Sequence, residues 1–138
     1  FREKKVQKFY FALTIKAPNP QEGKLKHFLL KDEARNVVQA YPKPYRDAKE
    51  SITHYETMGK QEAGYLLKIT PLTGRPHQIR VQLSAIGCPI LGDLKYGAPK
   101  ALPDASIGLH CFQMELMHPV RQEPLVVEAP PDGEWWRP

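Results

Sequence analysis

Hydrophobic and polar residues alternate along most of this chain, a pattern typical of β-strands with one buried face. In residues 6–15, for example, the apolar side chains of Phe9, Phe11 and Leu13 share one face, opposite Tyr10. The alternation predicts strands over residues 6–15, 25–30, 36–41, 51–58, 64–70, 109–117 and 125–129. Residues 1–5 are expected to be the end of a helix.

One segment has helical spacing instead. Ile79, Leu83 and Ile86 recur at intervals of four and three residues, which gives one apolar face and predicts a helix over residues 76–86. Pro76 suits the first helical turn, where its missing N–H would have no partner within the helix. The sequence therefore places one amphipathic helix among the strands.

Two further residues of this segment are informative, one just past its end and one within it. Gly87 lies just past the apolar face and can end the helix in a left-handed conformation. Arg80 falls beside Ile79, at the margin of the buried face. A half-buried cation needs an anionic partner, and no carboxylate in residues 72–81 is placed to meet it. Arg80 is therefore a candidate functional residue.

The strands are joined mainly by short turns, such as Gln61-Glu62 and His118-Pro119. This organisation predicts an α+β domain built on a mainly antiparallel sheet with few helices, because the strand–helix alternation of a parallel sheet is absent. The chain has 138 residues, the size of one domain. A polar, proline-rich end with Trp135 and Trp136 either caps the core or forms a tail.

Charge is unevenly distributed. Residues 1–50 hold 12 Lys and Arg against 6 Asp and Glu, whereas residues 51–138 hold 8 against 9. A basic first third suits a polyanionic partner such as RNA, and it is equally compatible with a solvated, lysine-rich surface. Two well-separated cysteines, Cys88 and Cys111, favour a reducing cytoplasm and lack the spacing of zinc ligands.

Three motifs resemble those of the RluA-type pseudouridine synthases. They are TGRPHQIRVQL at residues 73–83, GDLKYG at residues 92–97 and KFYFA at residues 8–12. The first two form a long and specific signature, and the resemblance extends over essentially the whole chain. Pro76 stands where the family more usually has Thr or Ser.

The resemblance implies an enzyme that isomerises uridine in RNA to pseudouridine, without cofactor or metal. Arg80 would pair with a catalytic aspartate, and Tyr10 would stack on the target base with its hydroxyl near the proton-transfer steps. Structural alternatives remain open for both. Arg80 could form an ion pair with Glu56 or Asp93, and Tyr10 could be an ordinary strand tyrosine.

Four further residues are candidate RNA contacts: Lys8, Arg75, His77 and Gln78. The last three fall at the expected helix start, where backbone N–H groups also favour phosphate. His77 could equally be a hydrogen-bonded structural residue, and Lys8 a solvated one. Asp93 lies in a Gly-Asp turn, so its side chain is expected to accept hydrogen bonds from local backbone N–H groups.

The family's nucleophile is the aspartate of a His-Arg-Leu-Asp segment, which precedes the Lys-x-Tyr-x-Ala strand by a few tens of residues. No such segment occurs in this sequence. Residues 1–138 are therefore expected to form a single unit, the C-terminal portion of a catalytic domain, and to be inactive alone. Two alternatives stay open: an RNA-binding module without chemistry, and a structural β-rich domain whose basic surface has no ligand.

Overall fold

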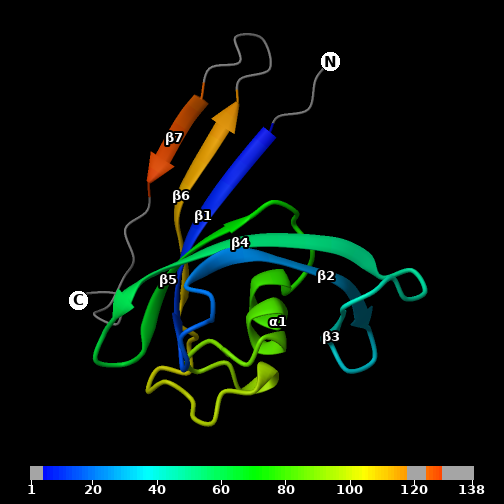
Figure 1. The fold of residues 1–138 in the computed structure, drawn as a ribbon, viewed down its shortest axis with the longest axis horizontal. Coiled ribbons are helices and arrows are strands. Elements are labelled where there is room, and N and C mark those ends of the chain that lie inside the picture. The colour runs from blue at the N-terminus through cyan, green and yellow to red at the C-terminus, as the bar shows by residue number, and fades with distance from the viewer. Residues whose placement is uncertain (1–4, 118–123, 129–138) are drawn as a thin grey trace.

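The computed structural model describes residues 5–117 and 124–128, which form one antiparallel sheet and one α-helix (Figure 1). The strands are β1 (Lys5–Thr14), β2 (Glu22–Asp32), β3 (Val37–Tyr41), β4 (Lys49–Lys60), β5 (Tyr65–Pro71), β6 (Leu109–Met117) and β7 (Pro124–Glu128). They lie in the order β3-β2-β4-β5-β1-β6-β7, and every neighbouring pair is antiparallel. The predicted α+β class is confirmed.

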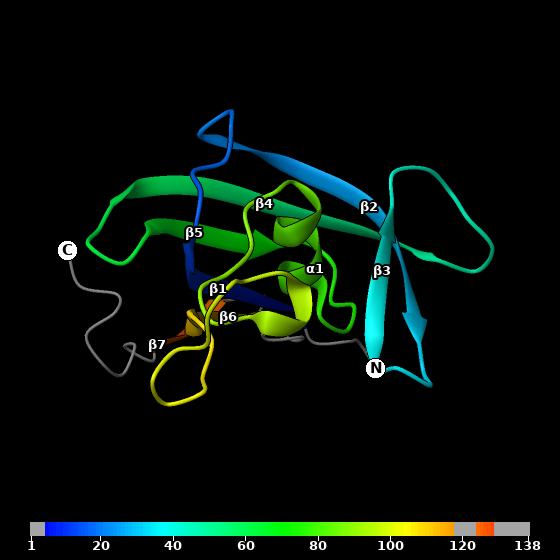
Figure 2. The same cartoon turned by 90° about the horizontal axis from the view of Figure 1, so that it is seen from below.

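The helix α1 (Gln78–Ala85) lies against the face formed by β2, β3, β4 and β5 (Figures 1 and 2). Ile79 and Leu83 point from it into the main core, where Leu67 and Ile69 of β5 are fully buried. Burying each aliphatic side chain of this kind contributes about 1.5–3 kcal/mol. The predicted apolar face is thus the face that holds the helix on the sheet.

The same helix also buries two glutamines. The hydroxyl of Thr53 on β4 donates to Gln82 Oε1 at 2.6 Å, and Gln82 Nε2 donates to the Ser51 carbonyl oxygen at 3.1 Å and lies 2.9 Å from His27 Nδ1. Gln82 is fully buried, so these bonds replace the water it loses. Hydrophobic periodicity could not indicate this polar contribution to the interface.

The ends of α1 differ in how well the sequence predicts them. Gly87 adopts φ +80°, and Gly87 N–H donates to the Ser84 carbonyl oxygen at 3.0 Å, which confirms the predicted left-handed stop. The helix begins at Gln78, not at residue 76, because His77 has φ 56° and closes a turn in which Gln78 N–H donates to the Arg75 carbonyl oxygen. Pro76 therefore precedes the helix.

The strand predictions are confirmed with small shifts of their ends, and β2 and β4 are longer than expected. Lys5 belongs to β1, so the expected helix does not include it. Three sequence-based expectations lie outside the described residues: the conformation of residues 1–4, the His118-Pro119 turn, and the placement of Trp135 and Trp136.

Residues 88–108 form an irregular segment that is hydrogen-bonded to β1 at Leu91 and Gly108 and carries a 3-10 helix, η1 (Leu94–Tyr96). An isolated bridge between Thr14 and Ile90 attaches this segment to β1. Gly92 has φ +82°, and a Cβ there would lie 2.6 Å from the Ser106 carbonyl oxygen, so the turn requires glycine. This turn brings Asp93 and Tyr96 into contact with α1. Among the described residues, no helix is long and apolar enough to span a bilayer.

Candidate functional site

A cleft of about 530 Å³ lies where β1, the stretch from the end of β5 to the start of α1, and the start of β6 meet. Its walls come from three parts of the chain that are distant in sequence. The lining residues are Gln7, Lys8, Tyr10, Pro71, Leu72, Thr73, Gly74, Arg75, His77, Gln78, Ile79, Arg80 and Leu109. All six candidate site residues of the sequence analysis are among them.

The charge of the cleft is one-sided. Lys8, Arg75 and Arg80 line it together with His77, and no Asp or Glu is among the described residues that do so. Cations gathered in a concave surface attract anionic ligands such as phosphate groups. This lining suits an anionic ligand, and no Asp or Glu among the described lining residues could act on one.

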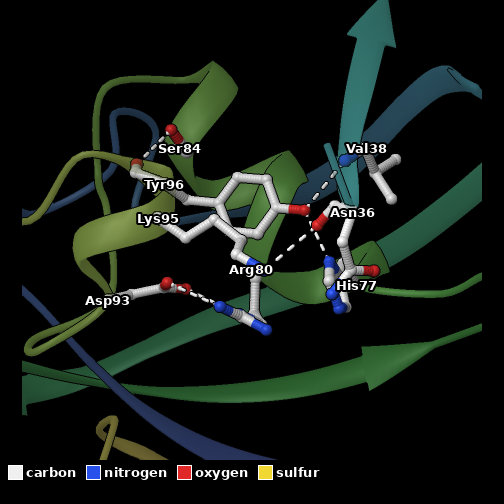
Figure 3. Close-up of polar contacts among 8 residues, drawn as sticks. All are labelled: Asn36, Val38, His77, Arg80, Ser84, Asp93, Lys95 and Tyr96. Atoms are coloured by element: carbon white, nitrogen blue, oxygen red, sulfur yellow. Dashed lines mark hydrogen bonds and ion pairs between the residues drawn. The ribbon is translucent and has the colours of Figure 1, made fainter. Parts of the chain in front are cut away.

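Arg80 has an acidic partner within this chain. Its Nε donates to Asp93 Oδ2 and its Nη2 donates to Asp93 Oδ1, both at 2.8 Å (Figure 3). The hydrogen bond with Asp93 is the largest cause of the raised pKa of Arg80. The expectation that Arg80 is neutralised by an acid that this chain does not supply is therefore wrong, and of the two structural alternatives left open the partner is Asp93, not Glu56.

The expected role of Asp93 is wrong for the same reason. Its carboxylate is 1% exposed and accepts both hydrogen bonds from Arg80, instead of accepting from nearby backbone N–H groups. A bidentate guanidinium–carboxylate pair compensates for the loss of water around a buried charge better than local N–H groups would. The sequence offered Asp93 as one of two structural partners of Arg80, and the fold shows that it is the one used.

This pairing leaves part of the guanidinium available. Nη1 of Arg80 makes no hydrogen bond to any residue that the structure describes, and the side chain is 23% exposed. The guanidinium carbon lies 4.9 Å from the centre of the Tyr96 ring, which supports it from a second direction. Arg80 is thus held in one position while it lines the cleft.

Tyr10 is the aromatic side chain of the cleft wall. It lies on β1 directly after a register irregularity between Phe9 and Tyr10, and it packs against the main core. Burial, and next to it the neighbouring Cys111, raises the pKa of the Tyr10 hydroxyl. The hydroxyl is therefore protonated at neutral pH, so Tyr10 offers both a ring face and an O–H group.

His77 is fixed at the start of α1. Its Nδ1 lies 2.6 Å from the hydroxyl oxygen of Tyr96, and this oxygen accepts a hydrogen bond from Val38 N–H at 3.0 Å (Figure 3). Burial, followed by the charge of Arg80, lowers the pKa of His77. The imidazole is neutral at physiological pH, and sequence reasoning did not identify Tyr96 as its partner.

Gln78 and Arg75 organise the loop before α1. Gln78 Oε1 accepts from Arg75 N–H at 3.0 Å and from the Thr73 hydroxyl at 2.7 Å. Gln78 Nε2 donates to the Ile52 carbonyl oxygen and to the Thr53 hydroxyl. These four bonds use the amide fully, so Gln78 shapes the cleft through the loop that it holds. Arg75 Nε donates to the Glu50 carbonyl oxygen, and Lys8 is exposed.

Cys88 and Cys111 are both free thiols. Within residues 5–117 and 124–128, no three His, Cys, Asp or Glu side chains gather to form a possible metal site.

Comparison with known proteins gives a consistent result. A family model described as RNA pseudouridylate synthase matches residues 1–85. Ribosomal large subunit pseudouridine synthase C of Buchnera aphidicola is 36% identical over 95% of this chain and 44% of that protein. The protein of the same name from Vibrio parahaemolyticus is 34% identical over 97% of this chain and 43% of that protein.

Solved structures agree with the sequence comparisons. Human RNA Pseudouridylate Synthase Domain Containing 4 superposes with a TM-score of 0.70 at 26% identity, over 91% of this chain and 57% of that one. Human RNA Pseudouridylate Synthase Domain Containing 1 gives a TM-score of 0.71 at 29% identity, over 91% and 55%. The chain spans less than half the length of the two bacterial relatives that it matches.

Proposed function

Because the chain belongs to the RNA pseudouridylate synthase family, we propose that it forms the RNA-binding wall of an active site that isomerises uridine to pseudouridine. The observation that carries this proposal is the cleft, in which Tyr10 and Arg80 lie among basic side chains and no acid lines the described walls. In the reaction the bond between N1 of the base and C1′ of the ribose breaks, the base turns, a bond forms between C5 and C1′, and the proton on C5 is lost while N1 gains one.

Each side chain has a distinct role in this proposal. The ring of Tyr10 stacks on a base that has left the RNA stack, because chemistry on a base needs it extruded. Lys8 and Arg75 bind phosphate groups, and His77 contacts the RNA beside them. Gln78 supports the loop that presents Arg75. Arg80 orients a nucleophilic carboxylate and keeps it ionised through a charge-assisted hydrogen bond.

The nucleophile in this proposal is an aspartate supplied by residues outside this sequence. Asp93 is unsuited to attack, because it is buried and both of its oxygens accept hydrogen bonds from Arg80. Nη1 of Arg80 is the guanidinium nitrogen that remains available to donate a hydrogen bond to a second carboxylate. In this proposal the chain alone binds RNA without turnover. The hypothesis of a pseudouridine synthase and the hypothesis of a non-catalytic RNA-binding module are then compatible.

The names of the relatives narrow the substrate. Two bacterial relatives are named for the ribosomal large subunit, and one from Pasteurella multocida is named a dual-specificity RNA pseudouridine synthase. We therefore propose structured RNA as the substrate class, with ribosomal RNA first and transfer RNA second. Two free thiols favour a reducing compartment such as the cytoplasm.

Release of tritium from RNA labelled at uridine C5 tests the proposal, because rejoining through this carbon expels the label. We expect none from the 138-residue chain alone and turnover from a longer form that carries a His-Arg-Leu-Asp segment. The chain alone should still bind the RNA, with an affinity that falls steeply as salt rises. Turnover by the chain alone would assign the acid to one of its own residues, and absence of binding would remove RNA as its ligand.

A further inference from the structure

We propose that Tyr96 is a positioning residue that fixes the imidazole of His77 with its proton on Nε2, so that His77 donates a hydrogen bond to an oxygen atom of bound RNA. This inference rests on the proposed function, since it requires RNA in the cleft. It adds Tyr96, which does not itself line the cleft, to the proposed site. It also assigns a protonation state to the His77 imidazole.

The hydrogen-bond inventory around Tyr96 carries the argument. The Tyr96 side chain is buried, and its hydroxyl oxygen already accepts from Val38 N–H at 3.0 Å. A buried O–H group needs an acceptor of its own. His77 Nδ1, at 2.6 Å, is the acceptor within reach among the described residues. The hydroxyl therefore donates to Nδ1, which leaves the proton of the neutral imidazole on Nε2.

The opposite tautomer is disfavoured by the same count. A proton on Nδ1 would donate to the Tyr96 oxygen, which would then accept two hydrogen bonds while its own O–H had no acceptor. An unsatisfied buried polar group costs about 1–3 kcal/mol. The positively charged form would carry the same proton on Nδ1 and the same penalty. Tyr96 thus selects both the neutral state and the tautomer.

The surroundings of Tyr96 make it a rigid support. Its ring stands edge-on to the His77 ring at a centroid distance of 5.6 Å, and it lies under the Arg80 guanidinium. Its carbonyl oxygen accepts from the Ser84 hydroxyl at 2.6 Å, which joins η1 to α1 (Figure 3). The left-handed φ of 56° at His77 costs backbone energy, and these contacts hold the residue in that conformation.

The charges that face His77 select an oxygen acceptor as its partner. Arg80 on α1, Lys95 on η1 and Lys31 on β2 all disfavour a positive imidazole, while Asp93 acts weakly in the opposite sense. Lys95 is held there by its bond to the Asn36 carbonyl oxygen at 3.0 Å. A neutral N–H donor amid cations suits a phosphate oxygen or a base carbonyl oxygen.

The tautomer is tested first, by the 15N chemical shifts of the His77 ring in the 138-residue chain near pH 7.5. The expected spectrum shows a protonated Nε2 and an unprotonated Nδ1 in the wild type, and a mixture of tautomers in Tyr96→Phe. A wild-type ring protonated on Nδ1 would overturn the proposal without recourse to any variant. A single Nε2–H tautomer in Tyr96→Phe would remove the role of Tyr96.

The donor is tested by binding of a stem-loop RNA with one loop uridine. His77→Gln places an amide N–H near the position of Nε2, whereas His77→Asn places it near Nδ1, so the two variants form a matched pair. We expect His77→Gln to bind within about threefold of the wild type and His77→Asn to bind about tenfold more weakly, as for the loss of one hydrogen bond. Equal affinities for both variants and the wild type would overturn the proposal.

The same RNA with an abasic site in place of the uridine separates the two oxygen sources. If His77→Asn also binds the abasic RNA more weakly than the wild type does, the acceptor is a phosphate oxygen. If the two proteins bind the abasic RNA equally, the acceptor is a base carbonyl oxygen. Either result supports His77 as a hydrogen-bond donor. Arg75→Ala distinguishes the two levels of the argument. If Arg75→Ala binds the RNA as tightly as the wild type, the proposed function itself is contradicted. If Arg75→Ala weakens binding and the two His77 variants do not differ from the wild type, only this inference is contradicted.

Discussion

Arg80 and Asp93, 13 residues apart in the chain, form a bidentate ion pair with both contacts at 2.8 Å. The acid is buried and the base reaches the cleft, so the pair extends from the protein interior to the functional surface. Asp93 thus stabilises the half-buried Arg80 guanidinium, and in the proposed function the remaining Nη1 pairs with a second carboxylate. This relationship links the stability of the fold to the chemistry of the cleft.

Replacement of Asp93 by Asn tests the structural half of that link. The substitution leaves the half-buried Arg80 charge without its partner, and we expect the free energy of unfolding to fall by about 2–4 kcal/mol. Equilibrium urea unfolding measures the change. Asp32→Asn is the matched control, because Asp32 pairs loosely and at the surface with Arg35, at 3.9 Å, and should change stability by less than about 1 kcal/mol. Equal effects of the two substitutions would contradict this account.

Tyr10 should contribute to RNA binding through its ring. Tyr10→Ala removes a stacking surface, which is worth about 1–3 kcal/mol per base, and should weaken binding of a uridine-containing single-stranded RNA by at least about fivefold. Tyr10→Phe keeps the ring and should bind within about twofold of the wild type. Fluorescence anisotropy of labelled RNA measures both.

The control for this experiment is a tyrosine that does not line the cleft. Tyr45 is exposed and stacks on Tyr41 at a centroid distance of 4.3 Å, in the segment between β3 and β4. Tyr45→Ala should leave the affinity for the same RNA unchanged. A loss at Tyr45 as large as that at Tyr10 would mean that the RNA lies elsewhere.

Stability should fall in mild acid. Burial lowers the pKa of both His27 and His77 in the folded protein. The unfolded chain therefore binds more protons as the pH falls from the ordinary histidine value near 6.5, so the stabilising contribution, complete above about pH 7, is lost as the pH drops through the folded pKa values. The urea midpoint should be lower at pH 5 than at pH 7.5.

His27→Asn identifies one of the two groups responsible. His27 Nδ1 accepts from Gln82 Nε2 in its neutral form, and an Asn side-chain oxygen can accept the same hydrogen bond without titrating. The variant should therefore show a smaller drop in urea midpoint between pH 7.5 and pH 5. A drop identical to that of the wild type would remove His27 from the explanation.

Much of this architecture could be predicted from the sequence. Alternation identified the strands, and the spacing of Ile79 and Leu83 identified the helix and its buried face. Gly87 marked the helix end because its left-handed φ is a local property. The motifs also located the cleft residues, because the segments that carry them converge on one cleft.

What the sequence could not reveal depends on tertiary contacts. The sequence could not decide between Glu56 and Asp93 as the partner of Arg80, because no periodic pattern encodes the path of residues 88–108, which are hydrogen-bonded to β1 at Leu91 and Gly108. Gln82 faces the core because Thr53 and Ser51 supply partners from another strand, which contradicts the usual polar-out expectation. The helical spacing places His77 within the helix, whereas His77 directly precedes α1 in a left-handed conformation that no periodic pattern indicates.

The central claim is that Arg80, anchored by Asp93, presents its remaining N–H groups to a catalytic acid. The direct measurement is the single-turnover rate of tritium release by a longer form that carries the His-Arg-Leu-Asp segment, compared between wild type and Arg80→Ala at saturating RNA. We expect the rate of Arg80→Ala to fall by at least about a hundredfold while RNA binding changes little, as for electrostatic groups that act on the reacting centre. A folded Arg80→Ala variant that turns over within twofold of the wild type would contradict the claim.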